Sequence, residues 1–135
     1  MAFAPLWLAT LFLYAATKGL NAEVGVIVYG LSNCSTCREA VKSLEAAGKD
    51  VTFRDVRKAP LSDAELAVIL AKLGAAAVNR RARSWQNLSD EIKAAEPDVQ
   101  IRADPRIMKR PLIQDGGTFH LGWNAKVRAL LLGQG

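Results

Sequence analysis

Two apolar segments and an amphipathic stretch between them begin the patterned part of the chain at residue 24. Residues 24–29 are apolar and rich in β-branched side chains, which is typical of a buried strand. The next stretch has apolar side chains at i, i+3, i+4 and i+7, which predicts a helix with one apolar stripe: Cys37, Ala40, Val41 and Leu44. Gly48 suits the position that ends such a helix, and residues 50–56 have the pattern of a second strand. The predicted order is therefore β-α-β.

A second helix is predicted next, and the spacing of apolar residues becomes irregular after it. Ser62 and Glu65 have the spacing of a capping box, and the apolar stripe after them ends at Gly74. From 75 to 101 the pattern is helical but broken, without a strong strand, and Pro97 interrupts it. Asp104-Pro105 predicts an N-cap and the first position of a short helix.

The C-terminal part has the pattern of a hairpin and a last helix. Residues 112–114 and 118–121 are predicted strands, and Asp115-Gly116-Gly117 predicts the turn between them. An apolar stripe then predicts a helix through Val127, Leu130 and Leu131. The whole order is β-α-β, a helical insertion, then β-β-α. This predicts an α/β fold of thioredoxin-like type, with a mixed sheet flanked by helices, over residues 24–135.

Residues 1–23 differ from the rest of the chain. Residues 2–17 carry no charge, but sixteen residues fall short of the roughly 20 that span a bilayer as a helix. No Lys or Arg precedes them, so the positive region of a signal peptide is missing. A weak membrane anchor, a poor or uncleaved signal, and a misassigned start all remain open. We expect an extension apart from the domain and a cytoplasmic protein; the alternative is a protein tethered to a membrane through residues 2–17.

Composition narrows the class of protein. A chain of 135 residues, 50% hydrophobic, is expected to fold as one domain rather than to be disordered. Its net charge of +5 permits an acidic partner without indicating one, and we expect no direct contact with nucleic acid. Two clusters of basic side chains could bind an oxyanion or could form ordinary solvated faces: Arg80, Arg81 and Arg83, and Arg106, Lys109 and Arg110. For most of them we favour the solvated face, with Arg110 as the exception.

The two cysteines carry the strongest chemical signal. Cys34-Ser35-Thr36-Cys37 lies where the first strand gives way to the first helix, and a helix N-terminus favours a thiolate. Arg38 adds a positive charge nearby. We therefore predict Cys34 as a nucleophile and Cys37 as the thiol that resolves a mixed disulfide. Half a zinc site or two inert thiols are the alternatives; with no second CxxC and a single histidine, we predict no metal site.

Four stretches together resemble a known family: 29–40 around the cysteines, 79–85, 107–113 with Lys-Arg-Pro-Leu-Ile, and 121–123. They resemble the arsenate reductase (ArsC) family in its broad sense, which includes Spx-type regulators. The 79–85 stretch is most similar to the branch of uncharacterised glutathione-linked reductases. The resemblance extends over about 24–132, and the CxxC with the downstream basic-Arg-Pro motif makes it specific.

The resemblance implies roles for several residues. Cys34 would attack the substrate, and Arg81 and Arg110 would bind an oxyanion. Asn33 and Arg38 would contact the substrate from the cysteine loop. Pro111 is a candidate for the cis-proline that faces the active cysteine, and its isomer is left open, because few X–Pro bonds are cis.

The resemblance also implies chemistry and partners. It implies a thiol-dependent reductase that acts on a small oxyanion or a disulfide. Glutathione would be a co-substrate, no cofactor would be tightly bound, and glutaredoxin or thioredoxin are further partners. We expect a monomer.

Two departures from true arsenate reductases bear on the substrate. Asp63 aligns where we expect their third arginine, and a carboxylate there would repel arsenate, so we expect weak or absent arsenate reduction. Cys37 shifts the chemistry toward an internal disulfide. The main alternatives are an Spx-type redox-sensing regulator that binds RNA polymerase and a membrane-tethered thiol–disulfide exchanger. We favour the reductase.

Overall fold

The structure is a computed structural model that describes residues 25–133. Its elements are, in order, β1 (Val26–Gly30), α2 (Ser35–Ala46), β2 (Val51–Asp55), α3 (Asp63–Leu73), η1 (Gly74–Ala77), α4 (Arg83–Gln86), α5 (Asp90–Lys93), α6 (Pro97–Ala103), η2 (Pro105–Ile107), β3 (Leu112–Asp115), β4 (Thr118–Leu121) and α7 (Ala125–Leu132). The expectation for residues 1–23 lies outside the described part of the chain. No helix between residues 25 and 133 is long and apolar enough to cross a membrane.

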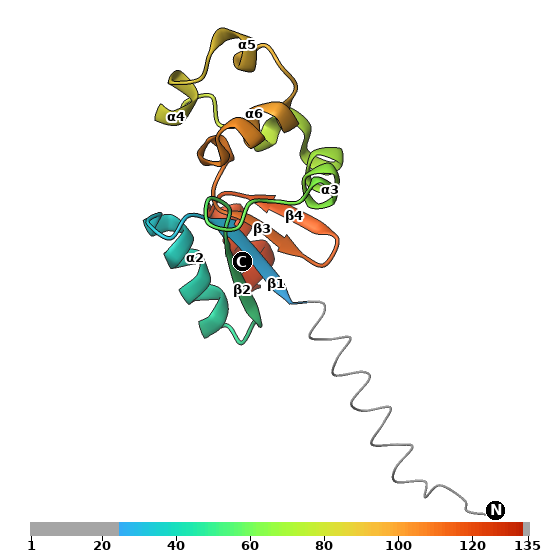
Figure 1. Cartoon of the computed structure of the whole chain (residues 1–135). Helices are drawn as coiled ribbons and strands as arrows, with labels where there is room; N and C mark the ends of the chain where they lie inside the picture. Colours follow the sequence, from blue (N-terminus) through green and yellow to red (C-terminus); the bar gives the residue numbers. More distant parts are fainter. Residues whose placement is uncertain (1–24, 134–135) are drawn as a thin grey trace, which may run out of the picture.

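The four strands form one mixed sheet in the order β2-β1-β3-β4 (Figure 1). β1 and β2 run parallel, with Val26 opposite Val51 and Gly30 opposite Asp55. β3 is antiparallel to β1, and β4 returns beside β3 as a hairpin. The carboxyl ends of β1 and β2 therefore lie at the same end of the sheet, where the cysteine loop begins.

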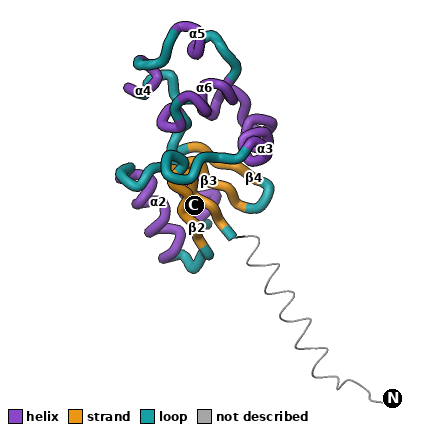
Figure 2. The backbone as a smooth tube through the Cα atoms, in the orientation of Figure 1, coloured by secondary structure: helices purple, strands orange, loops and turns teal. Residues whose placement is uncertain are grey.

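The alternation of side chains along the strands divides the core between the two faces of the sheet. Val28 and Ile113 pack with buried side chains of α2 and α7 on one face. Tyr29 and Leu112 pack with α3, α4, α6 and η2 on the other face. In Figure 2 the helical segments α4, α5 and α6 gather beyond one end of the strands.

Local signals explain where the first two helices begin and end. Cys34 is the N-cap of α2, and Gly48 follows its C-cap with φ of 84°. Such a positive φ favours glycine. The predicted capping box of Ser62 and Glu65 is present at the start of α3. Glu65 also pairs with Arg54 of β2 through contacts of 2.9 and 3.0 Å. This pair ties α3 to the edge strand of the sheet.

The structure refines the prediction for the insertion and the last helix. The broken helical pattern from 75 to 101 is confirmed as short helices. Pro97 does not interrupt a helix but begins α6, where its missing N–H needs no partner. Leu130 was predicted to face the core, but it is 62% exposed, and Val127 and Leu131 supply the buried face of α7.

Candidate functional site

Cys34 lies where the loop after β1 turns into α2. Its backbone N–H donates to the carbonyl of Leu31 at 3.0 Å, and its extended backbone suits an N-cap. Its Sγ accepts a hydrogen bond from the backbone N–H of Cys37 at 3.4 Å. One N–H of the first turn thus points toward this sulfur, at the positive end of the α2 dipole. The predicted placement of the first cysteine at a helix N-terminus is confirmed.

Cys37 lies one turn into α2 and is fully buried, whereas Cys34 is partly exposed. Burial, followed by the hydrogen bond with the Cys34 side chain, raises the pKa of the Cys37 thiol to about 12. Its sulfur rests against Gly30 at the end of β1, where an added Cβ would lie 2.5 Å from Sγ. Gly30 is therefore required for Cys37 to fit beneath the loop. The two thiols are free and differ sharply in access.

Asp55 at the end of β2 fastens this loop to the sheet. Its Oδ2 accepts hydrogen bonds from the Ser32 hydroxyl and from the Ser32 backbone N–H, the latter at 2.9 Å. Its Oδ1 accepts from the backbone N–H groups of Arg57 and Lys58 at 2.9 and 3.0 Å. The Ser32 hydroxyl, and then these N–H groups, hold the pKa of the Asp55 carboxyl far below its usual range, against the opposing effect of burial. One buried carboxylate thus fixes both the loop before Cys34 and the turn that carries Arg57.

A cavity of about 510 Å³, hereafter the thiol cavity, opens at Cys34. Besides Asn33 and Cys34, its lining includes four arginines: Arg57, Arg83, Arg106 and Arg110. Arg106 is paired with Asp104 at 2.7 Å. The other three arginines have no carboxylate within ion-pairing distance in the described part of the chain. The cavity is therefore complementary to an anion that approaches the Cys34 sulfur.

The structure brings together some of the predicted site residues and separates others. Asn33, Cys34 and Arg110 share the thiol cavity. The residue after Arg110, Pro111, is buried, and the peptide bond between them is cis. Arg81 lines a neighbouring cavity instead. Arg38 is exposed, and its guanidinium donates to the Ser32 carbonyl at 3.2 Å, so it braces the loop from outside the thiol cavity.

Several residues in and around the site were missed or misjudged from the sequence. Arg57 and Asp55 were not singled out, although residues just after parallel β2 should lie beside the end of β1. Arg106 was expected on a solvated basic face, but it lines the thiol cavity. The argument that Asp63 repels arsenate is wrong, because Asp63 pairs with Arg102 and does not line that cavity. Within residues 25–133 no cluster of three His, Cys, Asp or Glu side chains could hold a metal.

The mixed sheet, the CxxC pair at the start of α2 and the Arg-Pro step before β3 define a thioredoxin-like domain with a paired-thiol site. Within that class, the chain belongs to the ArsC family, whose family model matches residues 29–129. Both the predicted fold and the predicted family are thereby confirmed.

Relatives of this chain include uncharacterized proteins and transcriptional regulators. An uncharacterized protein of Haemophilus influenzae is 28% identical over 106 residues, covering 75% of this chain and 93% of that protein. The global transcriptional regulator Spx 2 of Lactococcus lactis is 27% identical over 113 residues, covering 78% of this chain and 86% of the regulator.

Solved structures show the same fold. The YFFB (PA3664) protein superposes with a TM-score of 0.70 at 23% identity, covering 79% of this chain and 98% of its own. An arsenate reductase (ArsC) related protein from Brucella melitensis gives a TM-score of 0.61 at 25% identity, covering 78% of this chain and 92% of its own.

Proposed function

We propose that this protein is a thiol-dependent reductase in which Cys34 is the nucleophile and Cys37 or glutathione resolves the intermediate. The observation that carries the proposal is the contrast between the two thiols. Cys34 is partly exposed in a cavity lined by arginines, and Cys37 is buried one turn below it. A reactive thiol beside a shielded one, at the start of one helix, is the arrangement that thiol–disulfide exchange uses.

With a disulfide substrate the reaction takes two exchange steps. The Cys34 thiolate attacks one sulfur, a Cys34 mixed disulfide forms, and the other sulfur leaves as a thiolate that takes a proton from water. Cys37 then gives its proton to water and attacks the Cys34 sulfur, which forms the internal disulfide and releases the second thiol. Two electrons pass from the protein dithiol to the substrate. Two glutathione molecules, oxidised together to glutathione disulfide, restore the dithiol.

The high pKa of Cys37 bears on which thiol resolves the intermediate. At neutral pH a thiol with a pKa of about 12 is almost wholly protonated, and only the thiolate attacks. Modification of Cys34 removes the second cause of that raised pKa, its hydrogen bond with Cys37. Burial remains, so glutathione that attacks the mixed disulfide directly is the competing route.

The arginines serve the anionic species of this cycle. Arg110 and Arg83 line the thiol cavity beside Cys34, where guanidinium groups stabilise a leaving thiolate or an oxyanion adduct. The further elements of the proposal are no tightly bound cofactor, regeneration by glutaredoxin or thioredoxin, and a cytoplasmic monomer. Arsenate stays a substrate to be tested, without the argument from Asp63.

The test measures which cysteine reacts. The variants Cys34→Ser and Cys37→Ser are treated with iodoacetamide at neutral pH, and the labelled residue is found by mass spectrometry. We expect Cys37→Ser to be labelled rapidly at Cys34, and Cys34→Ser to stay unlabelled until it is unfolded in urea. Turnover of a disulfide panel and of arsenate with glutathione follows. Rapid labelling of Cys37 in folded Cys34→Ser would refute the assignment.

A second candidate is an Spx-type redox-sensing regulator that binds RNA polymerase. It is favoured by the likeness to the Lactococcus lactis regulator over 78% of this chain and by the CxxC pair. In this case the Cys34–Cys37 pair would be a switch rather than a catalyst. Binding to purified bacterial RNA polymerase, measured with oxidised and reduced protein, separates the two. Redox-dependent binding without disulfide turnover would support the regulator over the reductase.

A further inference from the structure

One edge of the sheet is open to a further strand. β2 is the outermost strand on one side of the sheet, and it pairs with β1 (Figure 1). The backbone N–H of Val26 donates to the Asp50 carbonyl at 2.9 Å, and the N–H of Val56 donates to the Gly30 carbonyl at 3.0 Å. Alternate residues of a strand turn their backbone groups to opposite sides. The even-numbered residues from 50 to 56 therefore face β1.

Two odd-numbered residues of β2, Val51 and Phe53, therefore direct their N–H and C=O groups away from the sheet. Within residues 25–133 none of these four groups has a hydrogen-bond partner. The carbonyl of Asp55, the next odd-numbered residue, already accepts from the N–H of Ala59 at 2.8 Å. A row of free donors and acceptors along an outermost strand is a template for one more strand.

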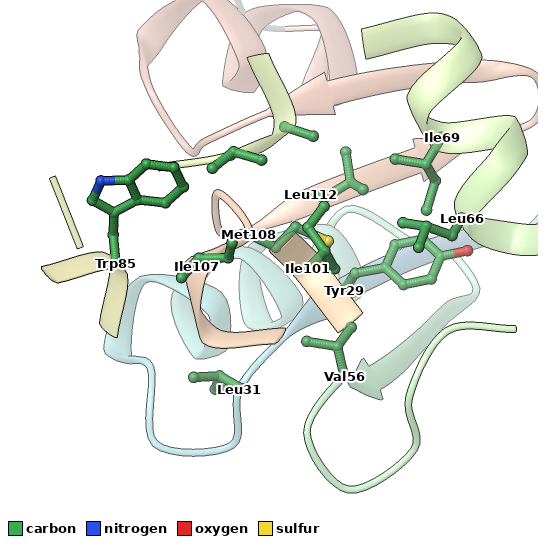
Figure 3. Close-up of a cluster of buried hydrophobic side chains, with 12 residues drawn as sticks. Tyr29, Leu31, Val56, Leu66, Ile69, Trp85, Ile101, Ile107, Met108 and Leu112 are labelled. Carbon is green, nitrogen blue, oxygen red and sulfur yellow. The ribbon is translucent and has the colours of Figure 1, made fainter. Parts of the chain in front are cut away.

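A groove of about 520 Å³ lies beside this strand, between β2 and α2, and we call it the edge groove. It is lined by Ser32, Arg38, Val41, Lys42 and Phe53. The Phe53 side chain is 36% exposed there, and Val41 adds apolar surface. The opposite face of the sheet is already covered, since Val56, directly after β2, packs with Tyr29 and Leu66 in the other core cluster (Figure 3). Of the two faces, the one toward α2 therefore offers an open apolar recess beside the strand.

The charge of the edge groove is one-sided. Arg38 and Lys42 are exposed and lie four residues apart on α2, hence on one face of the helix. In the part of the chain that the structure describes, neither has a carboxylate within ion-pairing distance, and no Asp or Glu lines the groove. Like charges at this spacing destabilise a helix, and an anion between them relieves the repulsion. The edge groove is therefore complementary to a ligand that combines an apolar side chain with a carboxylate.

We propose that β2 and the edge groove bind an extended acidic segment of a partner protein, which adds a strand to the sheet. The backbone of that segment pairs with the free groups of Val51 and Phe53. Alternate side chains of an added strand lie on one face. One apolar side chain therefore contacts Phe53 and Val41, and an Asp or Glu two residues away meets Arg38 or Lys42.

The same observations favour this occupant over two others. A small organic anion would leave the four backbone groups of the edge without partners. A second copy of this chain would bring another net charge of +5 to the same edge, and like charges repel. The site uses neither cysteine, so it does not rest on the proposed function.

The probe is a phage-displayed library of random heptapeptides without cysteine, so that thiol exchange plays no part. The library is selected on the full-length protein, and peptides that also bind Phe53→Pro are removed. Proline takes away the outward N–H, is tolerated on an outermost strand, and leaves the even-numbered residues paired with β1. We expect the enriched peptides to share an apolar residue with Asp or Glu two positions away.

The enriched peptides are then synthesised and titrated against variants. Lys42→Ala should weaken their binding about two- to fivefold, the range of one solvent-exposed ion pair. Lys72→Ala is the matched control, because Lys72 is an exposed lysine of α3, away from the edge groove, and this variant should bind as wild type. Phe53→Ala, which loses the ring but keeps the N–H, should bind more weakly than wild type and more tightly than Phe53→Pro.

Amide hydrogen exchange of the wild-type protein, followed by NMR, gives a second readout that needs no variant to fold. Without peptide, the N–H groups of Val51 and Phe53 should exchange fast, and those of Thr52 and Arg54, which face β1, should exchange slowly. At a peptide concentration of about ten times Kd, exchange at Val51 and Phe53 should slow about tenfold, because the free protein is depleted by that factor.

Four results would overturn the inference. They are no enrichment over Phe53→Pro, enriched peptides that bind Lys42→Ala as tightly as wild type, and binding that leaves exchange at Val51 and Phe53 unchanged. The fourth is a dimer in analytical ultracentrifugation that Phe53→Pro dissociates, since a second copy of this chain would then occupy the edge.

Discussion

Removing the Asp55 carboxylate should loosen the cysteine loop. In Asp55→Ala four donors lose their acceptor: the hydroxyl and N–H of Ser32 and the N–H groups of Arg57 and Lys58. In Asp55→Asn the side chain keeps its size and one oxygen. That oxygen can still accept from Arg57 and Lys58, but the amide NH₂ then faces the Ser32 N–H, which is also a donor. Comparing Asp55→Asn with wild type therefore measures the contact between the Asp55 side chain and Ser32 in the cysteine loop.

The size of the effect follows from the kind of hydrogen bond. Hydrogen bonds to charged groups contribute about 1.5–3 kcal/mol each to stability. The contributions of hydrogen bonds within one network are not additive. We expect Asp55→Ala to lower the free energy of unfolding by about 2–4 kcal/mol, and Asp55→Asn by about 1–2 kcal/mol. Urea unfolding measures both. Asp50→Asn is the matched control, because Asp50 is exposed, and such substitutions stay within about 0.5 kcal/mol.

The same carboxylate predicts a pH dependence of stability. The Ser32 hydroxyl holds the folded-state pKa of Asp55 below its value in the unfolded chain, which is about 3.9. Its contribution is therefore present in full well above pH 4 and is lost as the pH falls through and below the unfolded value. The difference in stability between wild type and Asp55→Asn should shrink as the solution is acidified from neutral pH.

Two results would refute this reasoning. One is an Asp55→Ala protein as stable as the Asp50→Asn control. The other is a stability difference between wild type and Asp55→Asn that stays constant down to acid pH. As a functional readout, alkylation of Cys34 by iodoacetamide in folded Asp55→Asn should differ from wild type, whereas Asp50→Asn should match it.

Two further predictions concern residues around the thiols. Gly30→Ala should destabilise the protein by about 1–3 kcal/mol in thermal unfolding, because the added Cβ would lie 2.5 Å from Cys37 Sγ. Gly117→Ala is the control, because Gly117 has open space around it. Equal melting temperatures of the two variants would contradict the packing argument. Arg110→Ala should reduce the rate of Cys34 with anionic iodoacetate more than with neutral iodoacetamide, since it lines the thiol cavity; an unchanged ratio of the two rates, or the same change in Arg102→Ala, would count against a role for Arg110 in attracting anions. Arg102 is used as the control rather than Arg106, because Arg106 also lines the thiol cavity.

The fold was predictable because its local signals agree with its packing. Three local signals mark helix ends: the capping box at Ser62, the glycine after α2 and the Asp104-Pro105 pair. Each acts on the backbone of the first or last turn, so it depends only on residues that are close in the sequence. Leu130 shows the limit. Because α7 has only eight residues, its apolar side chains are compatible with two neighbouring orientations of the helix. Packing against the sheet buries Val127 and Leu131 and leaves Leu130 exposed.

The site was predictable where it follows from one loop and less so where distant segments meet. Cys34 and Cys37 lie on the loop and its helix, so their different exposure follows from the helical period. Arg57, Arg83 and Arg110 come from three separate segments. Which arginine of the 80–83 cluster faces Cys34 depends on the direction of each side chain after the β-bridge between Val78 and Met108, and the spacing of residues does not contain that information.

The burial of Cys37 beneath Gly30 would determine which cysteine an oxidant reaches first. A peroxide that enters from solvent meets the partly exposed Cys34 first, and the fully buried, protonated Cys37 is shielded from it. Cys34 would then become a sulfenic acid, which condenses with a neighbouring thiol to a disulfide and loses water. With Cys37 held one turn away, this reversible product competes with further oxidation to sulfinic acid. In such a reaction the buried Cys37 would protect the exposed Cys34 from irreversible oxidation.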